Sequence, residues 1–281
     1  MTDFPQVELL IRQAIIEDLG DGDHTSLATI PAAARGKAKL LIKEEGILAG
    51  VQVARMVFNQ IDKELIFKSF LEDGQLVYNG DIAFEVEGKS QSILTAERLV
   101  LNFMQRMSGI ATHTHKLVQL LDGLPARLLD TRKTTPNMRI FEKLAVRIGG
   151  GYNHRFGLFD MILIKNNHID FAGGIEQALK RTIIYLEQNN KKLKIEIEVR
   201  NFDELKQVIA FGKVDRIMLD NFSTKDMNKA VEMIAGRFEA EASGGITESN
   251  LRQYAETGVD YISVGALTHH VKSLDMSLRA I

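Results

Sequence analysis

Basic side chains are concentrated in one stretch of the chain, from Arg127 to His168. This stretch holds eight lysines and arginines but three aspartates and glutamates, whereas the whole chain has a formal charge of −2. Guanidinium groups bind carboxylates and phosphates through paired hydrogen bonds, and lysine adds a compact positive charge. The stretch therefore predicts a pocket for a small ligand with several negative charges.

The basic residues fall in three short segments. They lie in a turn after an expected strand (130–136), in a glycine-rich segment (149–155) and at the end of another strand (165–168). The carboxyl ends of strands form the active-site face of α/β barrels, so the segments should converge. The alternative is a solvated charged surface with incidental salt bridges. The candidate residues are Thr131, Arg132, Lys133, His154, Arg155, Lys165 and His168.

Lys165 ends the apolar run Met161–Ile164, which predicts a buried stem and an ammonium group at the barrel mouth. A lysine that is desolvated beside other cations forms Schiff bases, as in aldolases. A lysine that keeps its charge holds an anion or a leaving group. We favour the second role, because Arg132 and Arg155 are expected nearby and an anion would relieve their repulsion.

Acidic residues mark two further strands. Glu196 and Glu198 alternate in one strand and therefore share a face, and Asp220 ends the next strand. A carboxylate inside a barrel is costly unless it has a partner. Either the basic residues satisfy these acids, or Glu198 and Asp220 hold ribose hydroxyls, a magnesium ion or a developing positive charge.

Two glycine-containing loops follow the last two expected strands. Glycine lets backbone N–H groups approach a phosphate closely, and the start of a helix favours negative charge. Barrels commonly bind phosphate after their last two strands, so the two loops together predict a phosphate site. The candidate residues are Ser243, Gly244, Gly245, Ser263, Val264 and Gly265.

The second part of the chain repeats a short strand followed by an amphipathic helix, as in the stripe of Met227, Ala230, Val231 and Ile234. Such a repeat predicts parallel strands with helical crossovers. The expected strands are 127–131, 160–165, 195–199, 216–220, 238–243 and 261–265. They are too few for a regular eight-stranded barrel, so we expect an α/β fold with an incomplete barrel of about six strands.

The first part of the chain predicts an N-terminal α+β domain. Its expected strands are 39–45, 65–70 and 82–86, separated by glycine and asparagine turns. A helix over 94–121, with an apolar stripe that includes Phe103 and Met107, should join it to the barrel. We expect domains at 1–108 and 109–270, with 271–281 packing back on the N-terminal domain.

Composition narrows the class of protein. With 45% hydrophobic and 26% charged residues, the chain is of the globular type. Its small net charge argues against a nucleic-acid-binding surface, and no apolar run approaches the ~18 residues of a membrane helix. There is no cysteine, which excludes disulfides and thiolate metal sites. The first residues lack the pattern of a signal peptide, so we expect a cytoplasmic protein.

Motifs spread over nearly the whole sequence resemble the quinolinate phosphoribosyltransferase family. They include Asp-Thr-Arg-Lys-Thr-Thr-Pro from Asp130 and Gly-Gly-Gly-Tyr-Asn-His-Arg from Gly149. In chain order the motifs are 17–23, 96–98, 101–103, 108–112, 130–136, 149–155, 165–168, 219–221, 243–246 and 263–269. The resemblance implies conversion of quinolinate and phosphoribosyl diphosphate, with magnesium, to nicotinate mononucleotide, diphosphate and carbon dioxide in NAD synthesis.

The resemblance also assigns roles by position. The residues that would engage the two quinolinate carboxylates are Arg132, His154, Arg155 and Lys165. Lys133 would reach the diphosphate, Glu198 and Asp220 would meet ribose hydroxyls or magnesium, and the two glycine loops would hold the 5′-phosphate. A homodimer, or a higher oligomer, is implied in which Arg98 of one subunit acts across the interface in its neighbour's site.

Three other functions are compatible with parts of the pattern. A paralogue associated with molybdenum transport keeps a similar Thr-Arg-Lys turn, but segments 153–155 and 165–168 fit the phosphoribosyltransferase better. A Schiff-base lyase rests on Lys165 alone and leaves the two phosphate loops unexplained. A non-catalytic phosphate-binding or scaffold protein would not need Glu198 and Asp220 at the barrel mouth.

The two roles of Lys165 are separated by chemical trapping. Because we expect Lys165 to stay charged, incubation with carbonyl substrates and borohydride should leave no covalent adduct. Mass spectrometry of peptides spanning Lys165 checks this outcome. A reduced adduct on Lys165 would establish the lyase chemistry instead.

Overall fold

The computed structural model describes residues 4–281, and the chain divides into two compact units that are each discontinuous in sequence. The first, called here the N-terminal unit, comprises the chain up to His115 together with Thr134–Gly150 and Leu267–Ile281. The second, called the barrel unit, comprises Lys116–Lys133 and Gly151–Ala266. No helix within 4–281 has both the length and the apolar content of a membrane span.

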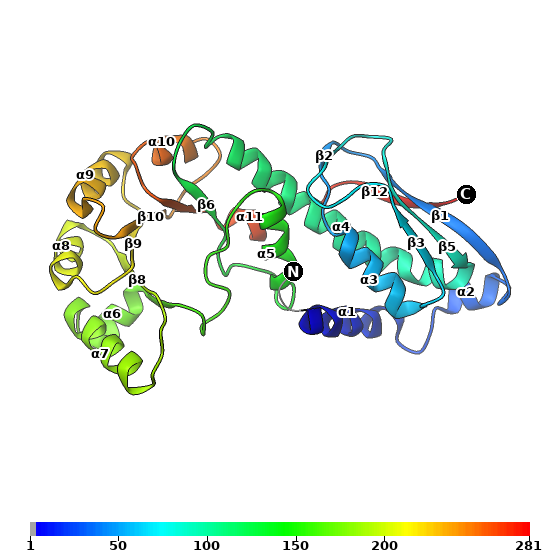
Figure 1. The fold of residues 1–281 in the computed structure, drawn as a ribbon, viewed down its shortest axis with the longest axis horizontal. Coiled ribbons are helices and arrows are strands. Elements are labelled where there is room, and N and C mark those ends of the chain that lie inside the picture. The colour runs from blue at the N-terminus through cyan, green and yellow to red at the C-terminus, as the bar shows by residue number, and fades with distance from the viewer. Residues whose placement is uncertain (1–3) are drawn as a thin grey trace. The chain divides into compact units, whose positions relative to one another are not determined.

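The N-terminal unit has the expected α+β architecture, built around an antiparallel sheet with the strand order β12-β1-β5-β3 (Figure 1). These strands are β1 Arg35–Ile42, β3 Ile66–Ser69, β5 Ile82–Lys89 and β12 Met276–Ala280. A separate pair is formed by β2 Gly46–Ile47 and β4 Leu76–Val77. The sequence analysis did not predict β12 as a strand, although its Met276 and Leu278 are buried against the sheet.

Helices of the N-terminal unit pack their apolar stripes inward. The expected helix over 94–121 is α4 Ser90–Gln119, and its Phe103 and Met107 are buried as predicted. Gly50 starts α3 with a φ of +99° and lies against Met104, so a side chain there would meet both strain and a close neighbour. The helices are α1 Phe4–Leu19, α2 His24–Thr29, α3 Val51–Ile61, α4 and α5 Arg139–Ile148.

The barrel unit contains the predicted six parallel strands in the order β6-β11-β10-β9-β8-β7. They are β6 Arg127–Leu129, β7 Ile162–Ile164, β8 Ile195–Val199, β9 Arg216–Asp220, β10 Glu239–Ser243 and β11 Tyr261–Ser263. In the described chain β6 and β7 are the two edges of this sheet, which confirms an incomplete barrel. Tyr152 forms an isolated parallel bridge with Leu129, so the glycine-rich segment lies alongside β6.

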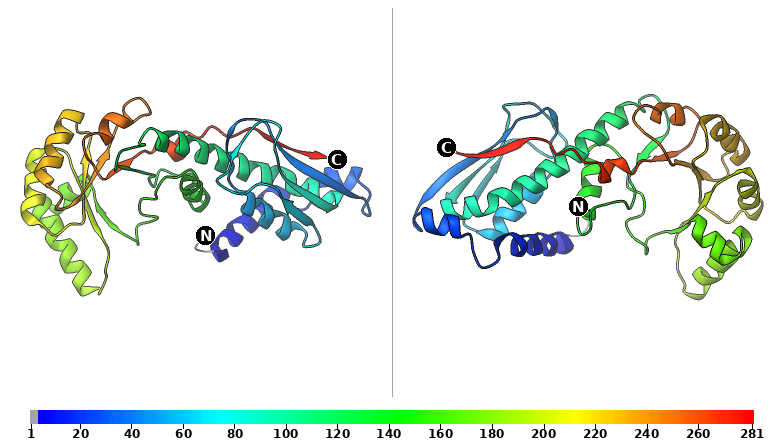
Figure 2. Two further views of the ribbon diagram at one scale, coloured as in Figure 1. Left: turned by 45° about the horizontal axis from the view of Figure 1, so that its top comes forward. Right: turned by 180° about the vertical axis from the view of Figure 1, so that it is seen from behind.

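The outer face of this sheet is apolar and covered by helices, as Figure 2 shows for the crossovers between successive strands. Ser223 caps α9 by accepting the N–H of Asp226, and Met227, Ala230 and Ile234 of that helix are buried. The helices of the unit are α6 Asn166–Ala172, α7 Ile175–Gln188, α8 Phe202–Phe211, α9 Thr224–Ile234 and α10 Leu251–Ala255, and α11 Ala266–His269 follows β11.

The inner face of the sheet carries the charged residues. Glu196 of β8 lies opposite Arg216 of β9, which in turn lies opposite Glu239 of β10. Because alternate residues of a strand share a face, Glu198 and Glu241 lie on this side too. The same alternation extends the charged face to Asp220 and Ser243 at the carboxyl ends of their strands.

Candidate active site

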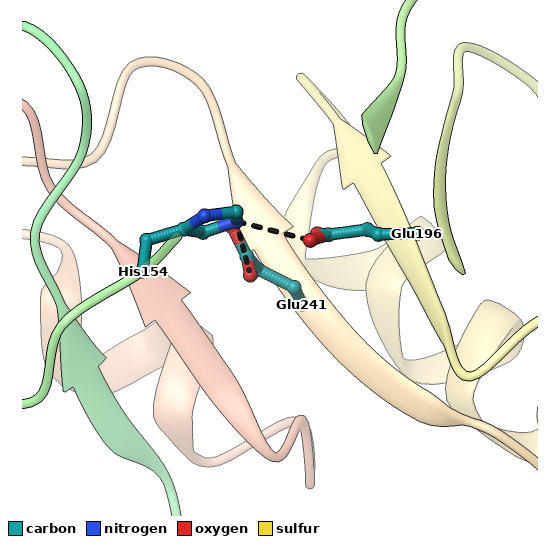
Figure 3. Close-up of side chains that lie close together, drawn as sticks. All are labelled: His154, Glu196 and Glu241. Carbon is teal, nitrogen blue, oxygen red and sulfur yellow. Dashed lines mark ion pairs between the residues drawn. The ribbon is translucent and has the colours of Figure 1, made fainter. Parts of the chain in front are cut away.

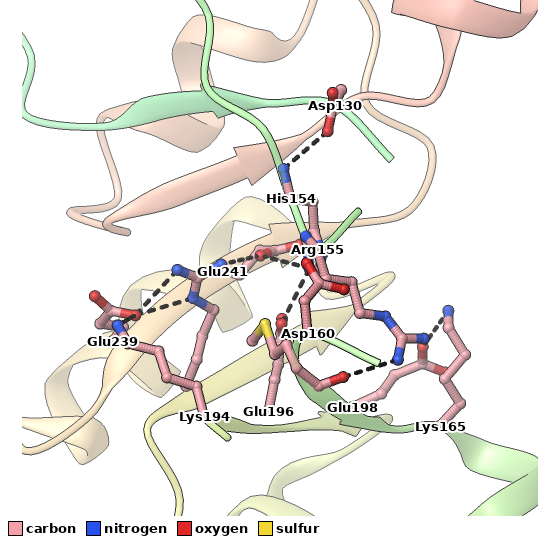
Figure 4. Close-up of polar contacts among 12 residues, drawn as sticks. Asp130, His154, Arg155, Asp160, Lys165, Lys194, Glu196, Glu198, Glu239 and Glu241 are labelled. Atoms are coloured by element: carbon pink, nitrogen blue, oxygen red, sulfur yellow. Dashed lines mark hydrogen bonds and ion pairs between the residues drawn. The ribbon is translucent and has the colours of Figure 1, made fainter. Parts of the chain in front are cut away.

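The carboxyl ends of the barrel strands bring together a lysine and two acids. Lys165 Nζ lies 3.2 Å from Glu198 Oε2, and the Glu198 side chain is buried whereas that of Lys165 is half exposed (Figure 4). Burial, and then the neighbouring charge of Glu198, raise the pKa of Asp220. Glu198 therefore has one of the predicted basic partners, and the two acids concentrate negative charge at the mouth.

Two guanidinium groups lie near each other in the barrel unit. Burial, followed by repulsion from Arg132, lowers the pKa of Arg155. Arg155 donates from Nη1 to the Met161 carbonyl over 3.2 Å. Within the described chain, the buried Nε atoms of Arg132 and Arg155 have no hydrogen-bond partner. Buried donors on repelling cations favour an anionic ligand that supplies the missing acceptors.

The His154 side chain points into the barrel interior and is not exposed on the surface. Its side chain is 6% exposed, and Nε2 lies 3.0 Å from Glu196 Oε2 and 3.6 Å from Glu241 Oε2 (Figure 3). Its Nδ1 accepts the backbone N–H of Arg155 over 2.7 Å. Both ring nitrogens thus face protein groups, and direct contact between His154 and a substrate carboxylate stays a prediction.

His154, Glu196 and Glu241 offer one ligand atom each within 4.8 Å of one another, which is the arrangement of a metal site. The ring argues against that use. Because Nδ1 accepts an N–H, a neutral imidazole must carry its proton on Nε2, the atom that faces the carboxylates. A metal ligand at Nε2 requires a lone pair there, so the cluster is built to hold a proton.

Two residues that were not predicted from the sequence belong to this region: Glu241 in the cluster and Arg216 beside it. Arg216 donates from Nη1 to Glu241 over 3.1 Å, and from Nε and Nη2 to Glu239 Oε2. Burial raises the pKa of Glu196 and of Glu241 to about 7. The alternating acids in Glu239–Ser243 were a usable signal, because they repeat the pattern of Glu196 and Glu198 in Ile195–Val199.

The other predicted residues have distinct surroundings. Lys133 is exposed, and its backbone N–H donates to Thr131 Oγ1 over 3.0 Å, which shapes the turn after β6. His168 Nδ1 accepts the Lys165 N–H over 2.9 Å and so caps α6. Arg98 belongs to the N-terminal unit, where it lines a cavity of about 400 Å³ with Asp18 and Asp23.

The first glycine loop has a backbone that other residues would not adopt. Gly244 has a φ of +93°, and a Cβ there would lie 2.3 Å from Asn221 Oδ1. Asn221 in turn donates its N–H to the Ser243 carbonyl over 2.8 Å. In this loop the expected helical start is absent, because α10 begins only at Leu251. After β11, by contrast, α11 follows directly from Gly265.

Comparison with known proteins identifies relatives over the whole chain. The family models "Quinolinate phosphoribosyl transferase, N-terminal domain" and "C-terminal domain" match residues 23–108 and 110–279. A quinolinate phosphoribosyltransferase [decarboxylating] of Nicotiana glauca is 46% identical over 96% of this chain and 81% of its own length. A probable nicotinate-nucleotide pyrophosphorylase [carboxylating] of Bacillus subtilis is 41% identical over 97% of this chain and 93% of its own.

Solved structures of similar proteins share the fold over the whole chain. The nicotinate-nucleotide pyrophosphorylase of Francisella tularensis superimposes with a TM-score of 0.92 at 43% identity, covering 100% of this chain and 98% of that one. NadC from Streptococcus pyogenes superimposes with a TM-score of 0.92 at 38% identity, covering 100% of both chains.

The buried acids predict a particular dependence of stability on pH. An acid whose pKa is higher in the folded than in the unfolded chain binds more protons when folded, between those two values. Through Glu196 and Glu241, the free energy of unfolding should fall as pH rises from about 4.5 to about 7. Glu241→Gln should make that fall smaller, as urea unfolding at a series of pH values would show.

Glu187→Gln is the matched control, because Glu187 is an exposed glutamate of the same unit. It should leave the pH dependence as in the parent chain. An unchanged pH dependence in Glu241→Gln would mean that the acid is ionised in the folded protein throughout this range.

Proposed function

The chain belongs to the quinolinate phosphoribosyltransferase family, and from this we propose that it transfers phosphoribosyl from phosphoribosyl diphosphate to quinolinate with decarboxylation. The products are nicotinate mononucleotide, diphosphate and carbon dioxide, in NAD synthesis. The observation that carries the proposal is the pair of adjacent guanidinium groups, on Arg132 and Arg155, whose buried Nε donors have no partner in the described chain. The alternatives, namely a molybdenum-transport paralogue, a Schiff-base lyase and a non-catalytic phosphate-binding or scaffold protein, gain no support from the relatives.

Quinolinate presents two adjacent carboxylates on a pyridine ring. Arg132 and Arg155 supply forked donors for carboxylate oxygens, and Lys165 adds a charge at the mouth. Lys165 forms an ion pair with Glu198 at 3.2 Å, which supports a role in holding anions. A dianionic ring fits a site in which cations repel one another, because it removes that repulsion when it binds.

Displacement at the anomeric carbon develops positive charge on the ribose as diphosphate leaves. Glu198 and Asp220, which concentrate negative charge beside that position, stabilise the charge and accept hydrogen bonds from ribose hydroxyls. Carboxylate oxygens are also the ligands that Mg²⁺ prefers, and magnesium bound with the diphosphate would neutralise the leaving group. Lys133, exposed in the turn after β6, reaches toward the diphosphate.

The 5′-phosphate is assigned to the loops after β10 and β11. Gly244 and Gly245 have φ values of +93° and +61°, which expose backbone N–H groups in a way that side-chain-bearing residues rarely allow. Decarboxylation follows ribosylation, because the positive charge of the quaternised ring nitrogen stabilises the electron pair that stays on the adjacent ring carbon as carbon dioxide leaves, and that carbon then takes up a proton from water. That step needs no protein base.

We further propose a homodimer, or a higher oligomer, in which Arg98 acts in the neighbour's site. The support is the motif around Ala96–Arg98 and an exposed Arg98 that lines a cavity with acidic Asp18 and Asp23. The cytoplasmic location stays a prediction from the sequence.

An absorbance assay tests the reaction. Quinolinate should disappear when phosphoribosyl diphosphate and magnesium are present, and nicotinate should react poorly because it lacks the second carboxylate. Lys165→Ala and Asp220→Ala should each lower turnover by about 10² to 10³, the usual cost of removing a preorganised electrostatic group. A preference for nicotinate would refute the dicarboxylate pocket.

A mixing experiment tests the shared site. Arg98→Ala and Lys165→Ala should each be nearly inactive, but heterodimers would contain one site that has lost neither residue. Activity should therefore recover partly after the two variants are mixed and exchange subunits. Mass spectrometry of tagged subunits shows whether exchange occurred, and exchange without recovery would refute a site shared between subunits.

A further inference from the structure

A layer of buried polar side chains lies in the barrel interior beneath the proposed dicarboxylate pocket. Glu196 and Glu241 are fully buried, and His154 and Arg216 are each 8% exposed. None of these positions except His154 is assigned a role in the transfer reaction above. Such groups are expensive to bury, and ion pairs within the layer offset part of that cost.

His154 connects this layer to the pocket above it. Below the ring, Nε2 lies 3.0 Å from Glu196 Oε2 and 3.6 Å from Glu241 Oε2. Above it, Nδ1 accepts the N–H of Arg155, the residue whose guanidinium faces Arg132. The backbone N–H of His154 donates to Asp130 Oδ1 over 2.8 Å, which fixes the position of the residue.

The hydrogen bond from the Arg155 N–H exists only while Nδ1 keeps its lone pair. That condition holds for the neutral tautomer with its proton on Nε2, and a carboxylate facing Nε2 favours that tautomer. Without the Glu196 carboxylate, the ring proton of His154 is free to move from Nε2 to Nδ1, where it would collide with the backbone N–H of Arg155. The segment would then shift, and a displacement of about 1 Å at a positioning group is enough to weaken a ligand contact greatly.

The acids are themselves held in place. Arg216, on the strand between those of Glu196 and Glu241, donates to Glu241 over 3.1 Å and to Glu239 over 3.0 Å. Its guanidinium also stacks 3.9 Å from the Tyr261 ring centroid. Glu239, Glu241 and the Tyr261 ring therefore hold the Arg216 guanidinium in place, and Arg216 holds the Glu241 carboxylate.

We propose that Glu196, Glu241 and Arg216 are positioning residues that hold His154 as its Nε2–H tautomer and thereby orient Arg155 for the ring dicarboxylate. The role in catalysis rests on the proposed function, whereas the tautomer itself does not. Glu196 acts on one substrate, because it reaches Arg155 through His154, whereas Glu241 also hydrogen-bonds to Ser263 of a loop assigned to the 5′-phosphate.

The tautomer is measured directly by NMR of the full chain labelled with ¹⁵N-histidine, with His154→Gln identifying the signal among the seven histidines. At neutral pH, His154 should show a protonated Nε2 and an unprotonated Nδ1. A doubly protonated ring or an Nδ1–H tautomer would overturn the proposal, whatever the activity of the protein.

Ligand binding tests the positioning role. Glu196→Leu removes the carboxylate that lies 3.0 Å from Nε2 and should weaken quinolinate binding about tenfold or more, the size expected for one buried unsatisfied donor. Glu196→Gln keeps an acceptor oxygen in the same place and should retain affinity within about threefold. Glu187→Leu, on an exposed helical surface, is the matched control. Calorimetry with quinolinate, and separately with phosphoribosyl diphosphate and magnesium, gives both affinities.

The pattern across the two ligands decides the matter. Loss of quinolinate affinity in Glu196→Leu, with phosphoribosyl diphosphate binding unchanged and Glu196→Gln intact, supports the proposal. Equal weakening of both ligands would show a general structural role and overturn it, as would normal quinolinate binding by Glu196→Leu. If the parent chain itself bound no quinolinate, the proposed function would fall, and the NMR result would still decide the tautomer.

Discussion

Burial of charge inside the barrel unit is the constraint on which the rest of this structure depends. Parallel sheets usually bury apolar side chains on both faces, but here Glu196, Arg216 and Glu241 occupy the inner face with little or no exposure. An isolated buried ion costs several kcal/mol, and removal of one partner from a buried pair costs about 3–5 kcal/mol. The chain meets this constraint with fixed registers, since Glu196, Arg216 and Glu239 are direct neighbours across three strands.

The buried charges are paired more completely at the amino ends of the barrel strands than at their carboxyl ends. Toward their amino ends Arg216 pairs with Glu239 and Glu241, and His154 Nε2 lies 3.0 Å from Glu196 Oε2. At the carboxyl ends the balance is incomplete, because Arg132 and Arg155 retain unpartnered buried donors within the described chain. The imbalance at that end is what a polyanionic substrate corrects, and the ion-paired layer beneath keeps the cations from relaxing away from it.

The sequence predicted the strands of the barrel to within about two residues, because each is a short apolar or alternating run bounded by turn residues. It did not predict β12, β2 and β4, which are short strands whose pairing depends on a partner distant in the chain. The convergence of the basic segments followed from the rule that strand ends share a face. The surroundings of His154 did not follow, because the direction of its ring is fixed by the Arg155 N–H and by acids on β8 and β10. Glu241 was overlooked because an alternating acidic strand looks the same in sequence whether its charged face is solvated or enclosed.

Strand β12 has a consequence for how the protein is made. Residues 276–280 pair with β1, yet they are synthesised almost 240 residues after it. A ribosome delivers the N-terminal part of a chain first, so β1 must wait through the synthesis of the whole barrel unit with one edge unpaired. Newly made chains are therefore exposed during translation to the edge-to-edge association that unpaired strands promote. Completion of the first sheet therefore requires that the barrel unit has already been synthesised.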